Sequence, residues 1–291
     1  MVRAALDRQA SETKNLNILH NLLSMSFYID NSWKEGNVSY VWNDIARLDS
    51  IITHRKTHVE MIHRPDWGVA CYMDGDIQSC ELDEGLYHES LVHPVMSSVV
   101  RPKRVMIIGG GEGATAREVL KWPSVECVDM YEWDEDVVRL FQTKYPQWAK
   151  GAWEDPRLHL HFEDIFEKIM TPPEELYDVM IIDLIEPDTD NMELWTALIR
   201  QLSFWIRPTG SISIYSGIRT MGRSEQPYQA LTELILKQSD RIITPYHFFL
   251  PCFLTECTFL LLSFSPDIIV DPTIPSHLTE NIWKSYTTFN W

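Results

Sequence analysis

The sequence predicts an α/β fold in which a doubly wound sheet follows a small N-terminal antiparallel β domain. A glycine-rich turn joins an apolar strand to a helix within residues 104–121, and strands alternate with helices as far as residue 264. This alternation is typical of a parallel sheet covered by helices on both faces. Short alternating segments between residues 37 and 78 indicate antiparallel strands instead. Ligands of doubly wound sheets bind at the carboxyl ends of the strands, so we expect the functional site there.

Composition limits the kind of protein and its partners. The chain has 291 residues, 45% hydrophobic and 23% charged, which is typical of one large globular domain with a smaller appendage. A net charge of −17 makes nucleic acid a poor partner and polycations plausible ones. The five cysteines lack paired metal-ligand spacing, which favours reduced thiols in the cytoplasm and argues against a disulfide framework or a metal site. No apolar run approaches ~20 residues, so we expect no contact with a membrane.

Changes in the hydrophobic pattern along the sequence divide the chain into three expected parts. These are an N-terminal helical extension over residues 1–35, a small β domain with a hinge helix over 36–98, and a larger α/β domain over 99–291. Apolar residues at helical spacing between Leu16 and Phe27 predict the extension. Turn signals at Pro65-Asp66 and Asp74-Gly75 separate the predicted short strands.

The glycine-rich turn is the strongest local signal. It follows the apolar strand 105–108 and precedes a helix predicted over 114–121. Its glycines, which let the backbone approach a ligand closely, include Gly109, Gly111 and Gly113. Glu132 ends the next predicted strand, about twenty residues on, where an acidic residue can accept both ribose hydroxyls of an adenosine.

The turn departs from the dinucleotide-binding pattern. Glu112 places a carboxylate where a pyrophosphate would need room and positive partners. An acid at this position suits a ligand that carries a cation. Together with an adenosine at Glu132, this favours a sulfonium nucleoside over a dinucleotide.

Several more side chains stand at or after the ends of predicted strands. Asp164 and Asp183 follow the strands 158–162 and 177–182, and Tyr215 ends the strand 211–215. We expect them to meet Gly109 and Glu132 at one edge of the sheet. Asp164 and Ile165 are candidates for reading an adenine, and Tyr87 and Gln78 for closing over the ligand.

Asp183 is the candidate catalytic base. A free alkylamine has a pKa near ~10.4 and must lose a proton before it can attack. A desolvated carboxylate that holds the ammonium and takes its proton would speed the reaction with a cationic electrophile.

Four segments resemble the ordered motifs of the polyamine aminopropyltransferases, the family of the spermidine, spermine and thermospermine synthases. The resemblance covers about residues 55 to 265, and the segments are Asp74-Gly-Asp-Ile-Gln78, Asp83-Glu-Gly-Leu-Tyr-His-Glu89, Ile107-Ile-Gly-Gly-Gly-Glu-Gly113 and Asp183-Leu-Ile-Glu-Pro187. The spellings Tyr-His-Glu and Gly-Gly-Gly-Glu-Gly look most like the thermospermine synthase branch.

The resemblance implies transfer of the aminopropyl group of decarboxylated S-adenosylmethionine to an amine, which releases methylthioadenosine. It implies a Rossmann-like, class I methyltransferase-type sheet in a homodimer, with neither a tightly bound cofactor nor a metal. The implied donor-binding residues are Gln78, Gly109, Gly111, Glu112, Gly113, Glu132, Asp164 and Ile165. Asp183, helped by Tyr87, would activate the polyamine, and the implied acceptor-side residues are His88, Glu186, Tyr215 and Glu256.

The chain departs from the family pattern on the acceptor side. Glu186 stands where the family writes a second aspartate, and Thr57 and Tyr215 stand where it has glutamines. The segment around Glu256 lacks the usual Trp or Tyr. The acceptor amine is therefore left open.

Two other functions remain open at this point. One is an S-adenosylmethionine-dependent N-methyltransferase or other alkyltransferase, although the carboxylate of an intact donor would lie beside Glu112. The other is a catalytically silent homologue that acts as a binding subunit.

Overall fold

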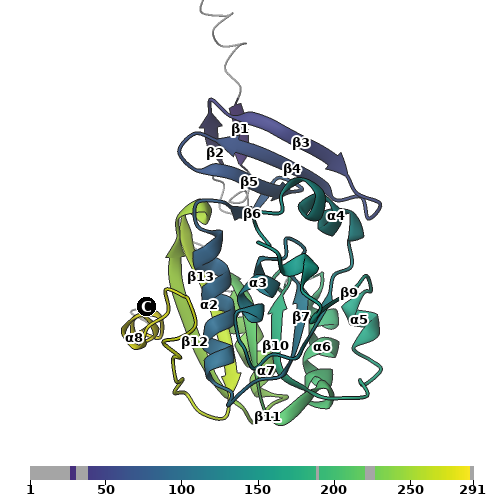
Figure 1. Cartoon of the computed structure of the whole chain (residues 1–291), viewed down its shortest axis with the longest axis vertical. Coiled ribbons are helices and arrows are strands. Elements are labelled where there is room, and N and C mark those ends of the chain that lie inside the picture. The colour runs from purple at the N-terminus through teal and green to yellow at the C-terminus, as the bar shows by residue number, and fades with distance from the viewer. Residues whose placement is uncertain (1–26, 31–38, 188–189, 220–226, 289–291) are drawn as a thin grey trace, which may run out of the picture. The chain divides into compact units, whose positions relative to one another are not determined.

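The computed structural model describes residues 27–30, 39–187, 190–219 and 227–288. They fall into two compact units (Figure 1). The smaller unit contains the described residues up to Ile52 together with Thr57–Cys80, and the larger contains Thr53–Lys56 and the described residues from Glu81 onward. The helix predicted as a hinge therefore belongs to the larger unit. Most of the predicted N-terminal extension lies outside the described residues, and Phe27 begins a strand rather than continuing a helix.

The smaller unit is built from antiparallel strands, as the alternating segments predict. Strand β1 (Phe27–Asp30) pairs with β2 (Tyr40–Asn43). A separate four-stranded sheet has the order β3 (Ala46–Ile52), β4 (His58–Arg64), β5 (Gly68–Met73) and β6 (Asp76–Cys80). The burial of β4 and β5 does not alternate, however, because each strand has four consecutive buried residues, Val59–Ile62 and Val69–Tyr72.

A seven-stranded sheet forms the centre of the larger unit. Its order is β12 (Ile242–Leu250), β13 (Thr255–Ser263), β11 (Ile206–Ile218), β10 (Tyr177–Asp183), β7 (Arg104–Gly109), β8 (Cys127–Tyr131) and β9 (Leu158–His161). Neighbouring strands are parallel except at β13, which runs antiparallel to both β11 and β12. The predicted doubly wound sheet is confirmed. Strand β12, an edge strand, is absent from the sequence-based assignment.

Helices cover both faces of this sheet (Figure 1). They are α2 (Glu84–Ser97), α3 (Ala114–Leu120), α4 (Glu135–Lys144), α5 (Ile165–Lys168), α6 (Met192–Trp205), α7 (Pro227–Leu236) and α8 (Glu280–Tyr286), with 3₁₀ turns η2 (Ala152–Glu154) and η3 (Pro251–Phe253). No helix in the described ranges is long and apolar enough to cross a membrane.

Burial on both faces explains why the central strands are continuous apolar runs in the sequence. Met106, Ile108 and Met180 from β7 and β10 pack in one buried cluster with Trp195 and Trp205 of α6. The alternate residues of the same strands are also buried, on the opposite face. A strand that is covered on both faces has no polar face to alternate with.

The strand order changes direction between β7 and β10. From β7 the chain builds outward to β8 and β9, and then returns to the other side of β7 to add β10 and β11. The carboxyl ends of β7 and β10 meet there, where Gly109 pairs in register with Asp183. This is the topological switch point at which doubly wound sheets bind ligands.

Candidate active site

The glycine turn passes close to the end of β10. Gly109 has φ +83°, and a Cβ added to it would lie 2.1 Å from the backbone oxygen of Asp183. Gly113 has φ +80°, and its Cβ would lie 2.3 Å from the indole ring of Trp153. Both positions therefore require glycine, because of both the left-handed backbone and the lack of room. The turn and Asp183 are held together by direct backbone approach.

Glu132 is oriented toward this turn. Its Oε1 accepts hydrogen bonds from the backbone N–H groups of Trp133 (2.8 Å) and Asp134 (3.0 Å). A Cβ on Gly111 would lie 3.1 Å from the other oxygen, Oε2. Burial raises the pKa of Glu132 to about 7, although the two backbone hydrogen bonds oppose the shift. The carboxylate is thus fixed through one oxygen, and its second oxygen lies beside the glycine turn.

The two predicted catalytic residues, Tyr87 and Asp183, are in direct contact. The Tyr87 hydroxyl, from α2, donates to Asp183 Oδ1 at 2.6 Å. Burial raises the pKa of Asp183 above its usual value, while the charge of His88 and hydrogen bonds from Tyr87 and Thr115 oppose the rise. A carboxylate with a raised pKa is a better proton acceptor near neutral pH, which is the property predicted for Asp183.

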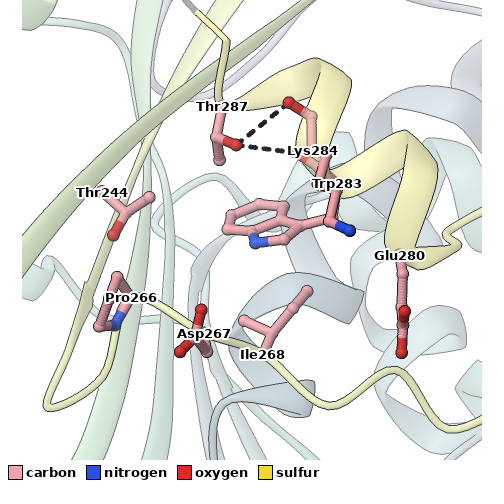
Figure 2. A pocket seen from close by; sticks show the side chains of 8 residues that line it. All are labelled: Thr244, Pro266, Asp267, Ile268, Glu280, Trp283, Lys284 and Thr287. Carbon is pink, nitrogen blue, oxygen red and sulfur yellow. Dashed lines mark hydrogen bonds between the residues drawn. The ribbon is translucent and has the colours of Figure 1, made fainter.

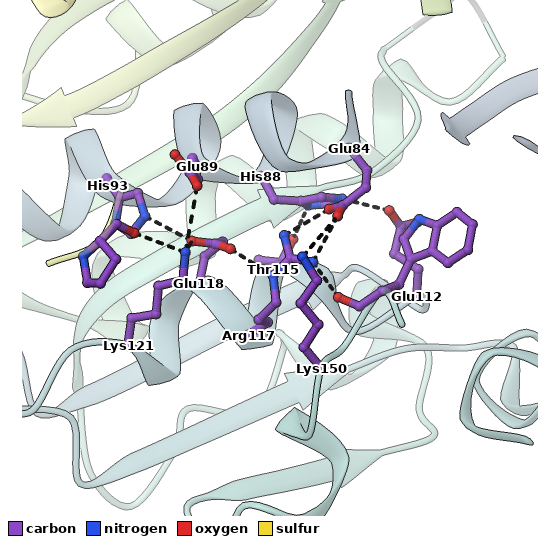
Figure 3. A network of polar contacts seen from close by, with 12 residues as sticks. Glu84, His88, Glu89, His93, Glu112, Thr115, Arg117, Glu118, Lys121 and Lys150 are labelled. Atoms are coloured by element: carbon purple, nitrogen blue, oxygen red, sulfur yellow. Dashed lines mark hydrogen bonds and ion pairs between the residues drawn. The ribbon is translucent and has the colours of Figure 1, made fainter. Parts of the chain in front are cut away.

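His88 joins Glu112 to Thr115, as Figure 3 shows. His88 Nε2 lies 2.6 Å from Glu112 Oε1, and Nδ1 lies 3.0 Å from Thr115 Oγ1. The Thr115 hydroxyl is also hydrogen-bonded to Asp183. Burial favours the neutral ring, but the charge and hydrogen bond of Glu112 outweigh it and raise the pKa of His88.

Thr115 is a site residue that the sequence analysis missed. Its hydroxyl links two of the predicted site residues, because it contacts both Asp183 and His88. The available signal was its place in the first turn of α3, two residues after Gly113. A threonine there faces back toward the carboxyl ends of the strands.

A buried ionic network fixes α2 against α3 (Figure 3). Arg117 donates to both oxygens of Glu84, at 3.0 and 2.8 Å, and to Glu118 at 2.7 Å. Glu118 Oε2 also lies 3.0 Å from His93 Nε2 and 2.5 Å from Lys121 Nζ. Since α2 carries Tyr87 and His88, the network sets the register in which these two side chains meet the site.

Asp164 and Ile165 follow β9 at the same edge of the sheet. Asp164 caps α5 by accepting from the backbone N–H of Phe166 at 2.9 Å, and Ile165 is 5% exposed. Asp164 therefore has a structural role that does not depend on a ligand. The adenine-binding role of both residues stays a prediction.

The predicted acceptor-side residues do not all come together. The Tyr215 ring centroid lies 5.7 Å from that of Tyr87, and burial, followed by the charge of Glu186, raises the pKa of Tyr215. Glu256 lies elsewhere. Its carboxylate pairs with Arg219 at 3.0 Å and lies 3.5 Å from His247 Nδ1.

The register of β13 explains the separate position of Glu256. Tyr215 pairs with Phe259, whose ring lies 5.5 Å from that of Tyr87. Side chains alternate along a strand, so Glu256 lies on the opposite face of the sheet from Phe259. Gln78, the remaining predicted donor ligand, is an exposed residue of β6 in the smaller unit, and its role stays a prediction.

A depression of about 480 Å³ lies between α8 and the start of β12 (Figure 2). Its lining residues are Thr244, Pro266, Asp267, Ile268, Glu280, Trp283, Lys284 and Thr287. None of them is a predicted site residue, so the depression is separate from the site at the carboxyl ends of the strands.

Comparison with known proteins identifies relatives. The family model of the spermine/spermidine synthase domain matches residues 84–262. Polyamine aminopropyltransferase 2 of Pseudomonas aeruginosa is 38% identical over 195 residues, which are 66% of this chain and 55% of that protein. A polyamine aminopropyltransferase of a Synechococcus strain is 33% identical over 237 residues, 77% of this chain and 75% of that protein. The chain thus spans about half the length of the first relative and three quarters of the second.

The fold also matches a solved structure. Spermidine synthase from Thermotoga maritima superposes with a TM-score of 0.79 over 91% of each chain, at 24% sequence identity. This structural similarity extends beyond residues 84–262, which the family model matches.

Proposed function

The chain belongs to the spermine/spermidine synthase family, and we propose that it is a transferase that moves an aminopropyl group from decarboxylated S-adenosylmethionine to a di- or polyamine. The observation that carries this proposal is the 2.6 Å contact between Tyr87 and the buried Asp183, directly beside the glycine turn. It supplies a proton acceptor with a raised pKa next to the place where the donor would bind.

In the proposed complex the donor lies along the carboxyl ends of β7 to β9. Glu132 accepts the ribose hydroxyls through Oε2, and Asp164 and Ile165 read the adenine. The glycines at 109, 111 and 113 leave room for the nucleoside backbone. Glu112 and Asp183 receive the aminopropyl ammonium, and the role of Gln78 in the smaller unit stays the prediction made from its motif. Decarboxylated S-adenosylmethionine acts as a co-substrate, and no tightly bound cofactor is needed.

The charge of Glu112 favours the decarboxylated donor over the intact one. Intact S-adenosylmethionine would bring its carboxylate beside Glu112, a contact between like charges. Among the described residues, His88 is the one side chain with an ion pair to Glu112, and its other ring nitrogen lies 3.0 Å from Thr115 Oγ1. The described ranges thus contain no Lys or Arg ion pair at Glu112 that would compensate a second carboxylate, which supports an aminopropyl rather than a methyl transfer.

The proposed reaction is a single displacement. The neutral nitrogen of the acceptor attacks the aminopropyl carbon bound to sulfur, and the carbon–sulfur bond breaks. The bonding electrons stay on sulfur, so methylthioadenosine leaves as a neutral thioether. Asp183 takes the proton that the acceptor nitrogen loses, and Tyr87 holds the carboxylate in position.

The acceptor is the finer part of the proposal. The motif spellings support an acceptor of the thermospermine branch, and Glu186 beside Tyr215 supplies charge for a second ammonium. Glu256, paired with Arg219, would act on the acceptor only after that pair opens. We also propose a homodimer, as the family resemblance implies.

Mass spectrometry of the products tests the proposed function. The protein is incubated with decarboxylated or intact donor and a panel of diamines, triamines and tetraamines, with Asp183→Asn as a matched control. We expect aminopropylated amines and methylthioadenosine from the decarboxylated donor, and almost no product from the variant. Methylated amines from the intact donor would instead establish a methyltransferase. Binding of methylthioadenosine without any product would establish a silent binding subunit.

A further inference from the structure

A second cluster of chemically active side chains lies on the other face of the large sheet. Cys127 and Asp129 are two residues apart on β8, and His159 lies opposite Asp129 on β9. Their Sγ, carboxylate and Nδ1 atoms lie within 4.8 Å of one another. We propose that these three residues bind a divalent transition metal ion of the zinc type. The proposal is independent of the proposed transferase function.

The strand register accounts for the convergence of the three donors. Residues i and i+2 of a strand point to the same face, so Cys127 and Asp129 share a face of β8. Tyr131, on that face, packs in the core cluster with α5 and α6. Asp183 points to the opposite face, where α2 supplies Tyr87. The cluster is thus separated from the candidate active site by the sheet itself.

The distances between the donors agree with those around a zinc ion. Tetrahedral zinc with normal bond lengths holds sulfur and nitrogen about 3.5 Å apart, and nitrogen and oxygen about 3.3 Å apart. Cys127 Sγ lies 3.6 Å from His159 Nδ1, and His159 Nδ1 lies 3.4 Å from Asp129 Oδ1. The other oxygen of Asp129 lies 3.5 Å from Cys127 Sγ. One ion can therefore reach all three residues with small side-chain movements.

Neighbouring groups already orient the central carboxylate. His161 Nε2 lies 3.0 Å from Asp129 Oδ1, and the Tyr177 hydroxyl donates to Oδ2 at 2.9 Å. Such outer hydrogen bonds fix the ligands of metal sites and raise metal affinity. His159 has a side chain that is 53% exposed, which gives the ion a path from solvent and leaves room for water as the fourth ligand.

The Arg104 guanidinium supplies the positive charge beside Cys127 and Asp129. Arg104 donates to Cys127 Sγ at 3.4 Å and to Asp129 Oδ2 at 3.0 Å. Its Nη1 also lies 3.6 Å from a carboxylate oxygen of Glu175, which is 69% exposed. A bound metal ion would push the guanidinium toward Glu175. Arg104 is therefore a competitor of the ion.

The donor set selects the class of ion. One sulfur, one imidazole nitrogen and one carboxylate oxygen suit Zn²⁺ and Co²⁺, whereas Mg²⁺ and Ca²⁺ require oxygen ligands. Binding would release the thiol proton to solvent. Because β9 is an edge strand whose neighbour in the described sheet is β8, the ion would cross-link the edge of the sheet.

The proposal revises an expectation from the sequence. The cysteine spacing argued against a zinc site because it contains no cysteine pair. The ligands come instead from a Cys-x-Asp segment and a His-x-His segment on adjacent strands, 127–129 and 159–161. Only the pairing of β8 with β9 brings these segments together.

Cobalt titration of the chelator-treated, untagged full-length chain provides the test. We expect one equivalent of Co²⁺ to give a thiolate-to-metal charge-transfer band, and Zn²⁺ to abolish it. Cys127→Ser should lose the band, and His159→Ala should weaken binding by at least ~10-fold. His63→Ala, which removes an exposed histidine of the smaller unit, is the matched control and should bind as the unaltered protein does. Circular dichroism of each variant establishes that it is folded.

Two further measurements make the result decisive. Arg104→Gln should tighten Co²⁺ binding, because it removes the competing charge. Zn²⁺ should raise the melting temperature by at least ~3 °C in the unaltered protein but not in His159→Ala. Absence of the thiolate band, or equal Co²⁺ affinity in His159→Ala and the unaltered protein, would overturn the proposal. Zinc inhibition of methylthioadenosine binding in His159→Ala would place the metal at the candidate active site instead.

Discussion

Two histidine–carboxylate pairs lie close together in the larger unit but differ in what surrounds them. His88 contacts Glu112 at 2.6 Å, and His93 contacts Glu118 at 3.0 Å, so both pairs join α2 to the segment from the glycine turn through α3. The Trp122 indole N–H donates to His93 Nδ1, which leaves Nε2 as the protonated nitrogen of a neutral ring. The charge and hydrogen bond of Glu112 instead raise the pKa of His88, although burial opposes them. The same two residue types are thus held in different electrostatic surroundings.

The carboxylates differ in how fully their charge is compensated. Glu118 also pairs with Arg117 and Lys121, and its side chain is 1% exposed. Glu112 is 13% exposed, and His88 is the only residue with an ion pair to it in the described ranges. A carboxylate saturated by protein cations contributes to stability, whereas one with remaining capacity can bind a cationic ligand. Glu118 is thus a carboxylate that stabilises the fold, whereas Glu112 is one that can bind a ligand.

The largest expected effect is on stability and separates the two glutamates. Glu118→Gln should lower the free energy of unfolding by about 3 kcal/mol, because Arg117 keeps Glu84 but loses its second carboxylate, and Lys121 loses its nearest one. Glu112→Gln should lower it less, because His88, unlike Arg117, can lose its charge by giving up a proton when the carboxylate is removed. Urea unfolding of both variants measures the difference. Equal losses of stability would mean that the two pairs are equivalent.

The acid sensitivity of the protein follows from the same carboxylate. Hydrogen bonds from His93 and Lys121 and the charge of Arg117 lower the pKa of Glu118 to about 2, although burial opposes them. A lowered folded-state pKa gives stability that is present above the usual value near 4.5 and lost as the pH falls toward 2. Glu118→Gln should make unfolding less dependent on pH in this range, and Glu112→Gln serves as the control.

The next effect is catalytic. Asp183→Asn keeps the shape of the side chain but removes the proton acceptor, so kcat should fall by ~10²-fold or more. Binding of methylthioadenosine should change little, because this product has no ammonium. Steady-state kinetics and calorimetry measure the two quantities. Retention of most of the activity would remove Asp183 from the role of base.

A smaller effect concerns the donor. Decarboxylated donor should bind at least ~10-fold tighter than the intact form, and Glu112→Gln should remove most of that preference. Glu118→Gln, measured where it remains folded, should keep it. Calorimetry with both donor forms measures the ratio. An unchanged preference in Glu112→Gln would show that its charge does not select the donor.

The smallest effect is a pH dependence that arises at Glu132. With a pKa of about 7 in the free protein, its ionised fraction falls about threefold from pH 7.5 to pH 6.5, and affinity for methylthioadenosine should fall with it. The raised folded-state pKa also means that stability declines as the pH rises from about 4.5 to about 7, since the unfolded chain loses this proton first. Glu132→Gln should abolish both trends. Calorimetry and thermal melts across this range provide the check.

Much of the fold could be predicted because its signals are local. The apolar run before Gly109 and the acidic residue after β8 mark strand ends in the sequence itself. Strand ends meet at one edge in a parallel sheet, so Glu132 and Asp183 were predicted to lie beside the glycine turn without tertiary information, and both lie there. The helix predicted over 114–121 agrees with α3 to within one residue at its end.

What the sequence did not reveal depends on pairing between distant segments. Strand β12 was missed because its stability comes from its neighbour β13. Glu256 was assigned to the acceptor side by its position in a motif, but the register of β13 places it beside Arg219. The link from Thr115 to His88 requires α2 to pack on α3, which no local pattern records.

The close approach of Gly109 to Asp183 has an evolutionary consequence. On the proposed donor side, the backbone itself forms the contact, and any side chain at position 109 would collide with the carbonyl of the base. Almost every single substitution at position 109 would therefore distort this half of the site. The proposed acceptor side is formed by exchangeable side chains such as Glu186 and Tyr215. We expect diversification of the lineage to proceed through the amine it accepts, with the donor kept constant.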